Sequence, residues 1–424
     1  MYDTGSTAFM LVSMGLVFLM TPGLAFFYGG LSRRKNVINT MFMSITVIGI
    51  AGVLWILAGW SFAYGGDGSL SFFGGFDQLG CLGAVAAMLT EAGTPADGLV
   101  YPSITDIGFQ AAFAMITTAI ITGSLAGRMK FGAAILFVSI WILLVYAPLA
   151  HMVWGGEGSL IGEQIGALDF AGGDVVHISS GLTGLILCLL LGRRKEFGMK
   201  NYRPHNVPFV VLGATLLWFG WFGFNGGSAF AADGIAALAI LNTAVASGAG
   251  LLSWMVVERV RTGKPTLVGA CTGLVAGLVG ITPAAGFVEP WAAIVIGVLV
   301  APFCYLAISH LKAKLGYDDA LDAFGCHAIG GIAGGILTGL FCVPELSWTS
   351  YGGLFYTGDP SLLGSQILGI LVTVLFVGVA SLLIGVIVKF AFKGSLRVDS
   401  GVEAMGLDVS IHGESAYPAY LGLD

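Results

Sequence analysis

The stretch Asp169-Phe-Ala-Gly-Gly-Asp-Val-Val-His177-Ile-Ser-Ser-Gly181 opens an apolar segment that is long enough to cross a membrane. A second stretch, Asp322-Ala-Phe-Gly-Cys-His327-Ala-Ile-Gly-Gly-Ile-Ala-Gly-Gly335, follows the same plan 150 residues later. In each, an acid precedes a histidine and glycines follow it, and such glycines let neighbouring helices approach closely. Ionisable side chains inside apolar segments usually mark the path of an ion or a proton.

The composition excludes a soluble domain. Of the 424 residues, 56% are hydrophobic and only 10% are charged, and the mean hydropathy is +0.91. Soluble domains carry about 25% charged residues. The apolar runs have lengths near the ~20 residues that span the hydrocarbon core of a bilayer. We therefore predict an all-α membrane protein with eleven transmembrane helices, at residues 8–30, 42–64, 106–126, 132–152, 175–192, 207–224, 235–257, 266–285, 291–310, 323–342 and 363–388.

The basic residues all fall on one set of alternating loops and on the tail, and the opposite loops carry none. Because positively charged loops stay in the cytoplasm, this pattern predicts a cell-membrane protein with its N-terminus outside and its C-terminus inside. The 18 basic residues are Arg33, Arg34, Lys35, Arg128, Lys130, Arg193, Arg194, Lys195, Lys200, Arg203, Arg259, Arg261, Lys264, Lys312, Lys314, Lys389, Lys393 and Arg397.

The outer loops are acidic. A surface of one sign concentrates counter-ions, so these loops favour a cation as the external solute. The alternative is that acids are simply tolerated on this side. The acids are Asp3, Asp67, Asp77, Glu91, Asp97, Asp106, Glu157, Glu163, Asp169, Asp174, Asp233, Glu289, Glu345 and Asp359.

Within the transport domain, residues 1–388, two copies of one five-span unit are expected, at 1–192 and 207–342. Each copy carries its histidine in its fifth span. Because five is odd, the second copy is inserted upside-down, as in many transporters whose pathway lies between inverted repeats. The span at 363–388 is an extra helix, and residues 389–424 form a polar cytoplasmic tail.

His177 and His327 occupy matching positions in the two copies, so we expect them to face each other. The alternative for either residue is a hydrogen bond between packed helices. Two neutral imidazoles can share one proton, one nitrogen donating and the other accepting. Their titrations would then be coupled. A dry pore with a polar stripe is the better interpretation, because two imidazoles alone make a poor metal site.

Aromatic residues gather at the predicted outer ends of three spans. Phe109 and Phe113 are four residues apart, as are Phe224 and Ser228, and Trp154 closes the fourth span. Residues four apart share a helix face. Such rings commonly form an interfacial belt, which is the alternative. Above two histidines, however, they also suit a small cation, because each cation–π contact contributes about 0.5–2 kcal/mol. The Ser228 hydroxyl can accept a hydrogen bond from such a cation.

Asp169 and Asp322 precede the two histidine helices. We predict that both cap the start of their helix, where a carboxylate satisfies free N–H groups and the helix dipole. Direct attraction of the cation is the alternative for Asp169. No catalytic pairing, phosphate loop or metal-ligand spacing is visible, and the six cysteines lack CxxC spacing. We therefore expect neither an enzyme nor a cofactor, metal or nucleic-acid partner.

Five motifs together closely resemble the ammonium transporter (Amt/Mep/Rh) family, and the tryptophan at 154 and the tail resemble its Amt/Mep branch. The resemblance covers nearly the whole chain. It rests on Ala150-His-Met-Val-Trp-Gly-Gly156, Leu168-Asp-Phe-Ala-Gly-Gly173 with Val175-Val-His177, Gly220-Trp-Phe-Gly-Phe-Asn-Gly-Gly-Ser228, Asp322-Ala-Phe-Gly-Cys-His327 and Gly406-Leu-Asp-Val-Ser-Ile-His-Gly-Glu-Ser-Ala-Tyr417.

The resemblance implies a homotrimer of eleven-span subunits, each with its own pore, and a PII-type (GlnK-like) regulator at the inner mouth. It places Thr282 close to the outer site. The implied roles are recruitment of ammonium for Phe113, Trp154 and Ser228 with Asp169 in support, a stacked gate for Phe109 and Phe224, and pore lining for His177 and His327 with Trp221 nearby.

The cost of desolvating an ion narrows the mechanism. An intact ammonium ion in an apolar pore costs several kcal/mol more than a few aromatic contacts return. We therefore expect deprotonation near the gate and passage of ammonia past the histidines, with the proton relayed along them so that transport is electrogenic. The alternatives are an electroneutral ammonia channel, a generic gas or water channel, and an ammonium sensor. The short tail, residues 389–424, argues against an autonomous sensor.

Overall fold

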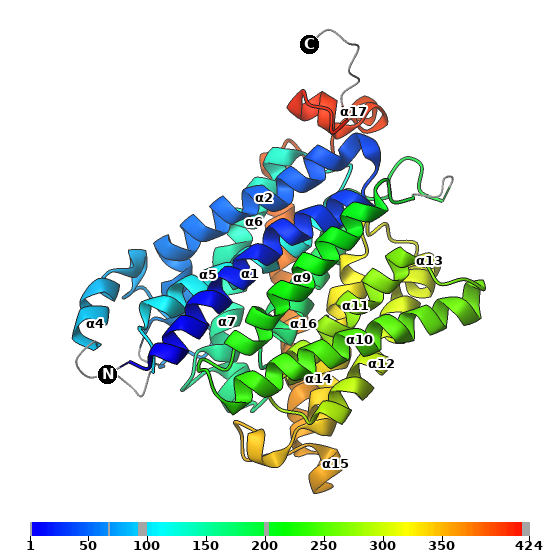
Figure 1. Ribbon diagram of the computed structural model, residues 1–424. Helices are drawn as coiled ribbons and strands as arrows, with labels where there is room; N and C mark the ends of the chain where they lie inside the picture. The colour runs from blue at the N-terminus through cyan, green and yellow to red at the C-terminus, as the bar shows by residue number, and fades with distance from the viewer. Residues whose placement is uncertain (1, 67, 92–99, 199–202, 418–424) are drawn as a thin grey trace.

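A computed structural model describes residues 2–66, 68–91, 100–198 and 203–417. Within them, eleven helices are long and apolar enough to cross a membrane, which confirms the predicted all-α class and span count. Asp67, Asp97 and Lys200, which entered the predicted charge pattern, lie outside the described residues, as does the side chain of Glu91. The first span begins near one end of the bundle and the tail helix α17 (Ser400–Met405) lies at the other (Figure 1).

Several spans join two helical segments through a π-helical turn. The spans are α1 (Thr4–Leu31), Arg34–Tyr64 (α2, Val37–Leu54, and α3, Trp60–Tyr64), α5 (Ile104–Leu125), Phe131–Trp154 (α6, Phe131–Trp141, and α7, Ala147–Trp154), Gly173–Leu191 (η7, Gly173–Ile178, and α8, Ser179–Leu191), α9 (Val207–Gly227), α10 (Gly234–Thr262), Leu267–Ala284 (α11, Leu267–Ile281), Pro290–Leu315 (α12, Pro290–Leu306, and α13, Lys312–Leu315), Phe324–Phe341 (η10, Phe324–Ala328, and α14, Ile329–Phe341) and α16 (Ser361–Ala391).

The second span begins at Arg34, earlier than the predicted residue 42. The predicted span left out the polar residues Asn39 and Thr40, whereas both are buried within α2. The Thr40 hydroxyl donates to the Asn36 carbonyl, and the backbone N–H of Asn39 donates to Asp408 of the tail. Tertiary partners therefore extend this helix beyond its apolar core.

The first spans of the two halves pack along each other as α1 and α9 (Figure 1). Glycines on α9 allow this close approach. A β-carbon on Gly213 would overlap the backbone of Phe27, and one on Gly223 would lie 2.8 Å from the carbonyl oxygen of Ser13. The two helices thus meet backbone to backbone along this seam, as small residues permit in membrane proteins.

The two histidine spans cross near the centre of the bundle. Gly181, four residues after His177, faces the backbone of Ala328, which a β-carbon would approach to 2.5 Å. Gly331, four residues after His327, faces the carbonyl of Gly173, which a β-carbon would approach to 2.8 Å. The same glycine position in each half therefore makes the crossing possible and brings the histidines together.

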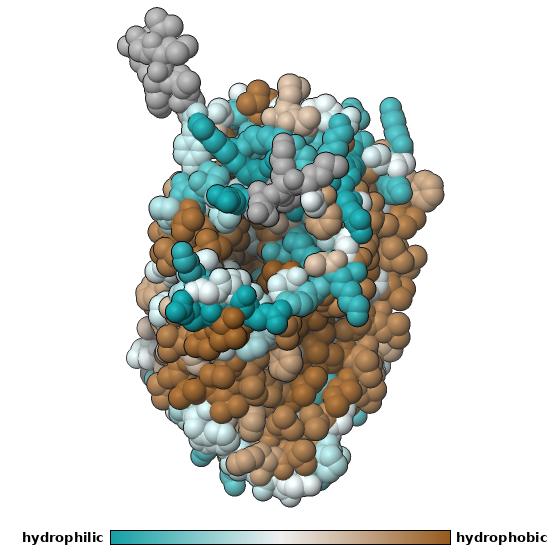
Figure 2. All heavy atoms as spheres, turned by 90° about the vertical axis from the view of Figure 1, so that its right-hand side faces the viewer, coloured by the Kyte–Doolittle hydropathy of each residue, from teal (hydrophilic) through white to brown (hydrophobic). Residues whose placement is uncertain are grey.

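The outside of the bundle shows a belt of hydrophobic side chains between two more polar ends (Figure 2). Leu252 and Val256 of α10 and Leu375 of α16 are more than half exposed within this belt. Exposure of so many aliphatic side chains to water would be unfavourable, whereas the hydrocarbon core of a bilayer accommodates them. The belt is therefore the surface expected to face the lipid of a bilayer.

Basic loops and the tail meet at one end of the bundle. Lys35 donates to the carbonyl of Glu403, whose carboxylate accepts from Arg397 at 2.6 Å and from the backbone N–H of Lys195 at 3.0 Å. Leu407 donates its N–H to Asn36 at 2.9 Å. The tail thus ties together the loops that follow the first and fifth spans.

Candidate functional site

The start of the first histidine helix is built around Asp169. Its two carboxylate oxygens accept the backbone N–H groups of residues 172 to 175 at 2.6–3.3 Å. These are N–H groups that the helix itself cannot satisfy. The predicted capping role of Asp169 is thus confirmed. Burial raises the pKa of this carboxyl above its usual value, while the four N–H donors act in the opposite direction.

The predicted cap of the second histidine helix is wrong. Asp322 does not cap it, because its backbone has the left-handed φ of 62° and its carboxylate pairs with Lys312 at 2.6 Å. Asp319 takes the role instead and accepts the N–H of Phe324 at 2.8 Å. Asp319 stands eight residues before His327, the same separation as between Asp169 and His177.

The two histidines meet as predicted. Their Nδ1 atoms lie 3.3 Å apart, and both rings are buried, with exposures of 1% and 5%. Both lie in π-helical turns, η7 and η10, which often occur at functional sites. The Nε2 atom of His177 lies 3.4 Å from the hydroxyl of Thr282, which also accepts from Trp221 Nε1 at 2.9 Å. Trp221 stacks on His177 with ring centroids 5.4 Å apart.

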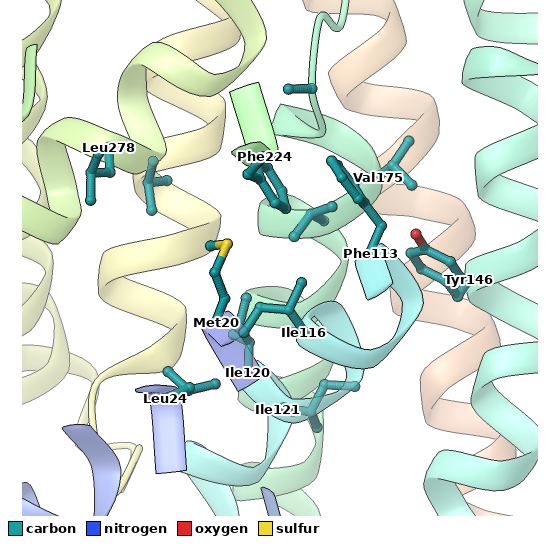
Figure 3. Close-up of a cluster of buried hydrophobic side chains, with 14 of the residues drawn as sticks. Met20, Leu24, Phe113, Ile116, Ile120, Ile121, Tyr146, Val175, Phe224 and Leu278 are labelled. Atoms are coloured by element: carbon teal, nitrogen blue, oxygen red, sulfur yellow. The ribbon is translucent and has the colours of Figure 1, made fainter. Parts of the chain in front are cut away.

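The rings of Phe113 and Phe224 stack directly, with centroids 4.1 Å apart and an angle of 12° (Figure 3). The family resemblance implied a stack of Phe109 on Phe224, which is wrong. Phe109 instead packs behind Phe113, at 4.9 Å and 52°, and is fully buried. Because Phe109 and Phe113 share one face of α5, spacing alone could not tell which ring would reach Phe224.

A cavity of ≈ 900 Å³ opens on one side of this stack. Phe113, Trp154 and Ser228, here called the outer cup, all line it. The Trp154 ring meets Phe113 edge-on at 6.2 Å and its indole N–H donates to the Asp169 carbonyl at 2.8 Å. The Ser228 hydroxyl donates to the Phe224 carbonyl at 2.9 Å, which leaves its lone pairs to accept from a solute. Four acids also line this cavity: Asp106, Glu157, Glu163 and Asp169.

A second cavity, of ≈ 310 Å³, lies on the other side of the stack. Phe224, Trp221 and both histidines line the part of it next to the stack. The rest of the wall near the stack is apolar, and sequence reasoning did not single these residues out because they resemble any other core positions. They include Met20, Leu24, Ile116 and Ile120 (Figure 3). Towards the basic end the same cavity is lined by Arg33, Arg194 and Asp322.

Ion pairs surround the basic end of this cavity. Arg194 and Asp318 form a bidentate pair, with Nη2 to Oδ1 at 2.5 Å and Nε to Oδ2 at 2.8 Å. Arg128, whose side chain is fully buried, donates to the Asp318 carbonyl at 2.5 Å. Burial alone would raise the pKa of the Asp318 carboxyl, but the hydrogen bonds and charge of Arg194 hold it below its usual value.

Comparisons with known proteins agree on one family. The model of the Ammonium Transporter Family matches residues 8–417. The chain is similar to the ammonium transporter of Bacillus subtilis, with 47% identity covering 97% of this chain and 98% of that protein. It is also similar to the ammonium transporter of Aquifex aeolicus, with 48% identity covering 98% of this chain and 94% of that protein.

Solved structures show the same fold. The crystal structure of Saccharomyces cerevisiae Mep2 superposes with a TM-score of 0.84 at 34% identity, covering 94% of this chain and 88% of that one. The similarity extends over the histidine spans and both cavities, which all lie within the matched residues. The chain therefore belongs to the Ammonium Transporter Family, and it is a multi-pass membrane protein that transports ammonium and is not an enzyme.

Proposed function

We propose that the protein captures ammonium from outside in the outer cup, that ammonium gives a proton to the His177–His327 pair near the Phe113–Phe224 stack, and that ammonia passes into the second cavity. One observation carries this proposal: two stacked rings separate an acid-lined cavity from an apolar one that begins at two paired histidines. The acids attract a cation to the first cavity. The apolar second cavity admits a neutral molecule far more readily than an ion.

The hydrogen bonds around His177 support a relay. The Thr282 hydroxyl donates to the Leu278 carbonyl at 2.8 Å, so its oxygen acts as the acceptor for Trp221 and for His177 Nε2. His177 then carries its proton on Nε2, and its Nδ1 accepts from Nδ1–H of His327. A proton given to one ring can leave from the other after a tautomer change. We therefore favour electrogenic transport.

The remaining assignments follow from the charge pattern and the family. The basic end with the tail would face the cytoplasm, with the outer cup outside. The equivalent caps, glycines and histidines of the two halves support an inverted repeat of residues 1–192 and 207–342. We further propose a homotrimer with one pore per subunit, and a PII-type regulator that covers the inner mouth.

Uptake of labelled methylammonium tests the site in a strain that lacks its own ammonium carriers. Trp154→Leu should raise the apparent KM about 3- to 30-fold, the range of a cation–π contact. His177→Ala should lower the maximal rate about 100-fold, the usual scale for loss of a proton-transfer group. Trp291→Leu and His310→Ala are matched controls, because both residues are outside the two cavity walls, and should leave uptake unchanged.

Currents in proteoliposomes separate the mechanisms. Electrogenic transport predicts a current that depends on ammonium and disappears in His177→Ala. Uptake without any current would leave only the electroneutral ammonia channel. A sensor would be indicated if neither uptake nor current were found while the protein still bound ammonium. A sensor is the second candidate function because the chain is similar to a solved structure described as a sensor Amt protein, with 26% identity and a TM-score of 0.85.

A further inference from the structure

The loop that follows α9 contains a strained phenylalanine. Phe230 has φ of 56°, in the left-handed region that bulky L-residues rarely adopt and that glycine or asparagine normally occupies. Only three other described non-glycine residues, Cys81, Asp322 and Lys393, have a positive φ. Strained residues of this kind persist where a functional requirement holds them, so the reason for a phenyl ring here must be found.

Neither the turn nor the core requires the ring. The turn is closed by backbone bonds, from the N–H of Phe230 to the Gly227 carbonyl at 2.9 Å and from Ala229 to Gly226 at 3.2 Å. A glycine at position 230 would make the same bond without strain. The side chain is 36% exposed, so its burial returns less than that of a core phenylalanine.

The ring is instead placed at the outer cavity. Phe230 lines that cavity together with all three residues of the outer cup. Its ring meets Phe109 edge-on at 6.0 Å and 76°. Phe109 in turn contacts Phe113, and Phe113 contacts Trp154. Phe230 is therefore the solvent-side end of a continuous run of rings that has Trp154 at its other end.

We propose that Phe230 is a further cation-binding residue, which holds a small NH-bearing cation at the rim of the outer cup. The acids of the cavity wall attract such a cation but hold it in water, whereas an aromatic face binds it after partial desolvation. With this left-handed backbone the ring lines the cavity. This inference rests on the proposed capture of ammonium in the outer cup.

Four substitutions test it through the apparent KM for methylammonium uptake and the Tm of the purified protein. Phe230→Leu keeps apolar bulk and strain but has no aromatic face, and Phe230→Gly removes both ring and strain. Both should raise KM about 3- to 30-fold, the range of one cation–π contact. Phe230→Tyr should keep the wild-type KM. Phe72→Leu, an exposed phenylalanine outside the cavity wall, is the matched control and should also keep it.

The Tm readout separates binding from packing. Phe230→Gly should be at least as stable as the wild type, because glycine relieves the strain. A wild-type KM in Phe230→Leu or Phe230→Gly would overturn the inference, as would a Tm for Phe230→Gly below that of Phe230→Leu. Trp154→Leu measured alongside distinguishes the two failures: if it raises KM while the Phe230 variants do not, the outer cup stands and only the role of Phe230 is lost.

Discussion

Each of the two histidine helices begins with a capping carboxylate, but the residues around the two carboxylates differ. Asp169 and Asp319 each stand eight residues before a histidine, and each accepts the N–H of the residue five positions on. Around Asp169 the neighbours are aromatic, with the Trp154 indole on its carbonyl. Around Asp319 they are ionic, with Lys312 on its carbonyl at 2.6 Å. The two histidine helices therefore share the same kind of carboxylate cap at their start. They differ in the side chains around that cap, which are aromatic at one end of the bundle (the aromatic mouth) and ionic at the other (the ionic mouth).

This difference has a functional meaning. An aromatic mouth provides weak, partly dry contacts that suit a cation about to lose a proton. An ionic mouth provides fixed, paired charges that hold loops in place. This difference in side chains lies outside the crossing of the two histidine spans. Substitutions at the crossing should therefore affect the stability of both spans alike, whereas substitutions at the aromatic or ionic mouth should not.

The largest expected effect is at the crossing of the two histidine spans. Gly181→Val and Gly331→Val should both abolish folding or transport, because the added carbons would meet backbone atoms that cannot move aside. Expression level, Tm and uptake measure this. Gly364→Ala in α16 is the control, since a β-carbon there meets nothing within 4 Å, and it should be neutral or stabilising by up to about 1 kcal/mol. A well-folded, active Gly181→Val would break the equivalence of the halves.

The next effect is confined to the ionic mouth. Asp318→Asn should cost about 3–5 kcal/mol at pH 7, because it leaves the buried Arg128 and Arg194 without their carboxylate. The folded-state pKa of Asp318 lies below its unfolded value, so its contribution is complete above pH ~4 and is lost as the pH falls through the folded pKa. The Tm difference between wild type and variant should therefore shrink on acidification. A difference that grows instead would contradict this assignment.

The smallest expected effect on stability comes from substitution of the two capping carboxylates. Asp169→Asn should cost about 1.5–3 kcal/mol, because an amide has only one acceptor oxygen for four N–H donors. Asp319→Asn removes the charge from a single N–H contact and should cost about 1 kcal/mol. Tm values of the two variants in one detergent measure the contrast. Equal losses would mean that the carboxylates act through charge rather than through the number of bonds.

Much of the architecture was predictable because each membrane span corresponds to a long apolar run in the sequence. The eleven spans and the meeting of His177 with His327 followed from length and from matching positions. Asp169 was also recognisable as a cap, because it lies a few residues before the start of its helix.

The errors concern choices between neighbours on one short segment. Asp319 and Asp322 both precede His327, and only the left-handed turn at Asp322 decides which carboxylate reaches the helix. Phe109 and Phe113 share a helix face, and only the position of α9 decides which ring stacks on Phe224. The first decision depends on a backbone turn that the spacing of the acids does not reveal, and the second on packing between segments distant in sequence.

The glycine seam between α1 and α9 also limits how the protein can move. Many transporters expose their site to each side in turn by rocking one repeat against the other. Here the segments proposed as two repeats are joined backbone to backbone at Gly213 and Gly223, and again where Gly181 meets Ala328. Rocking would have to separate both seams at once. Rotation of the Phe113 and Phe224 rings requires no such rearrangement of the helices. We therefore expect the helices to stay in place during transport while these side chains move.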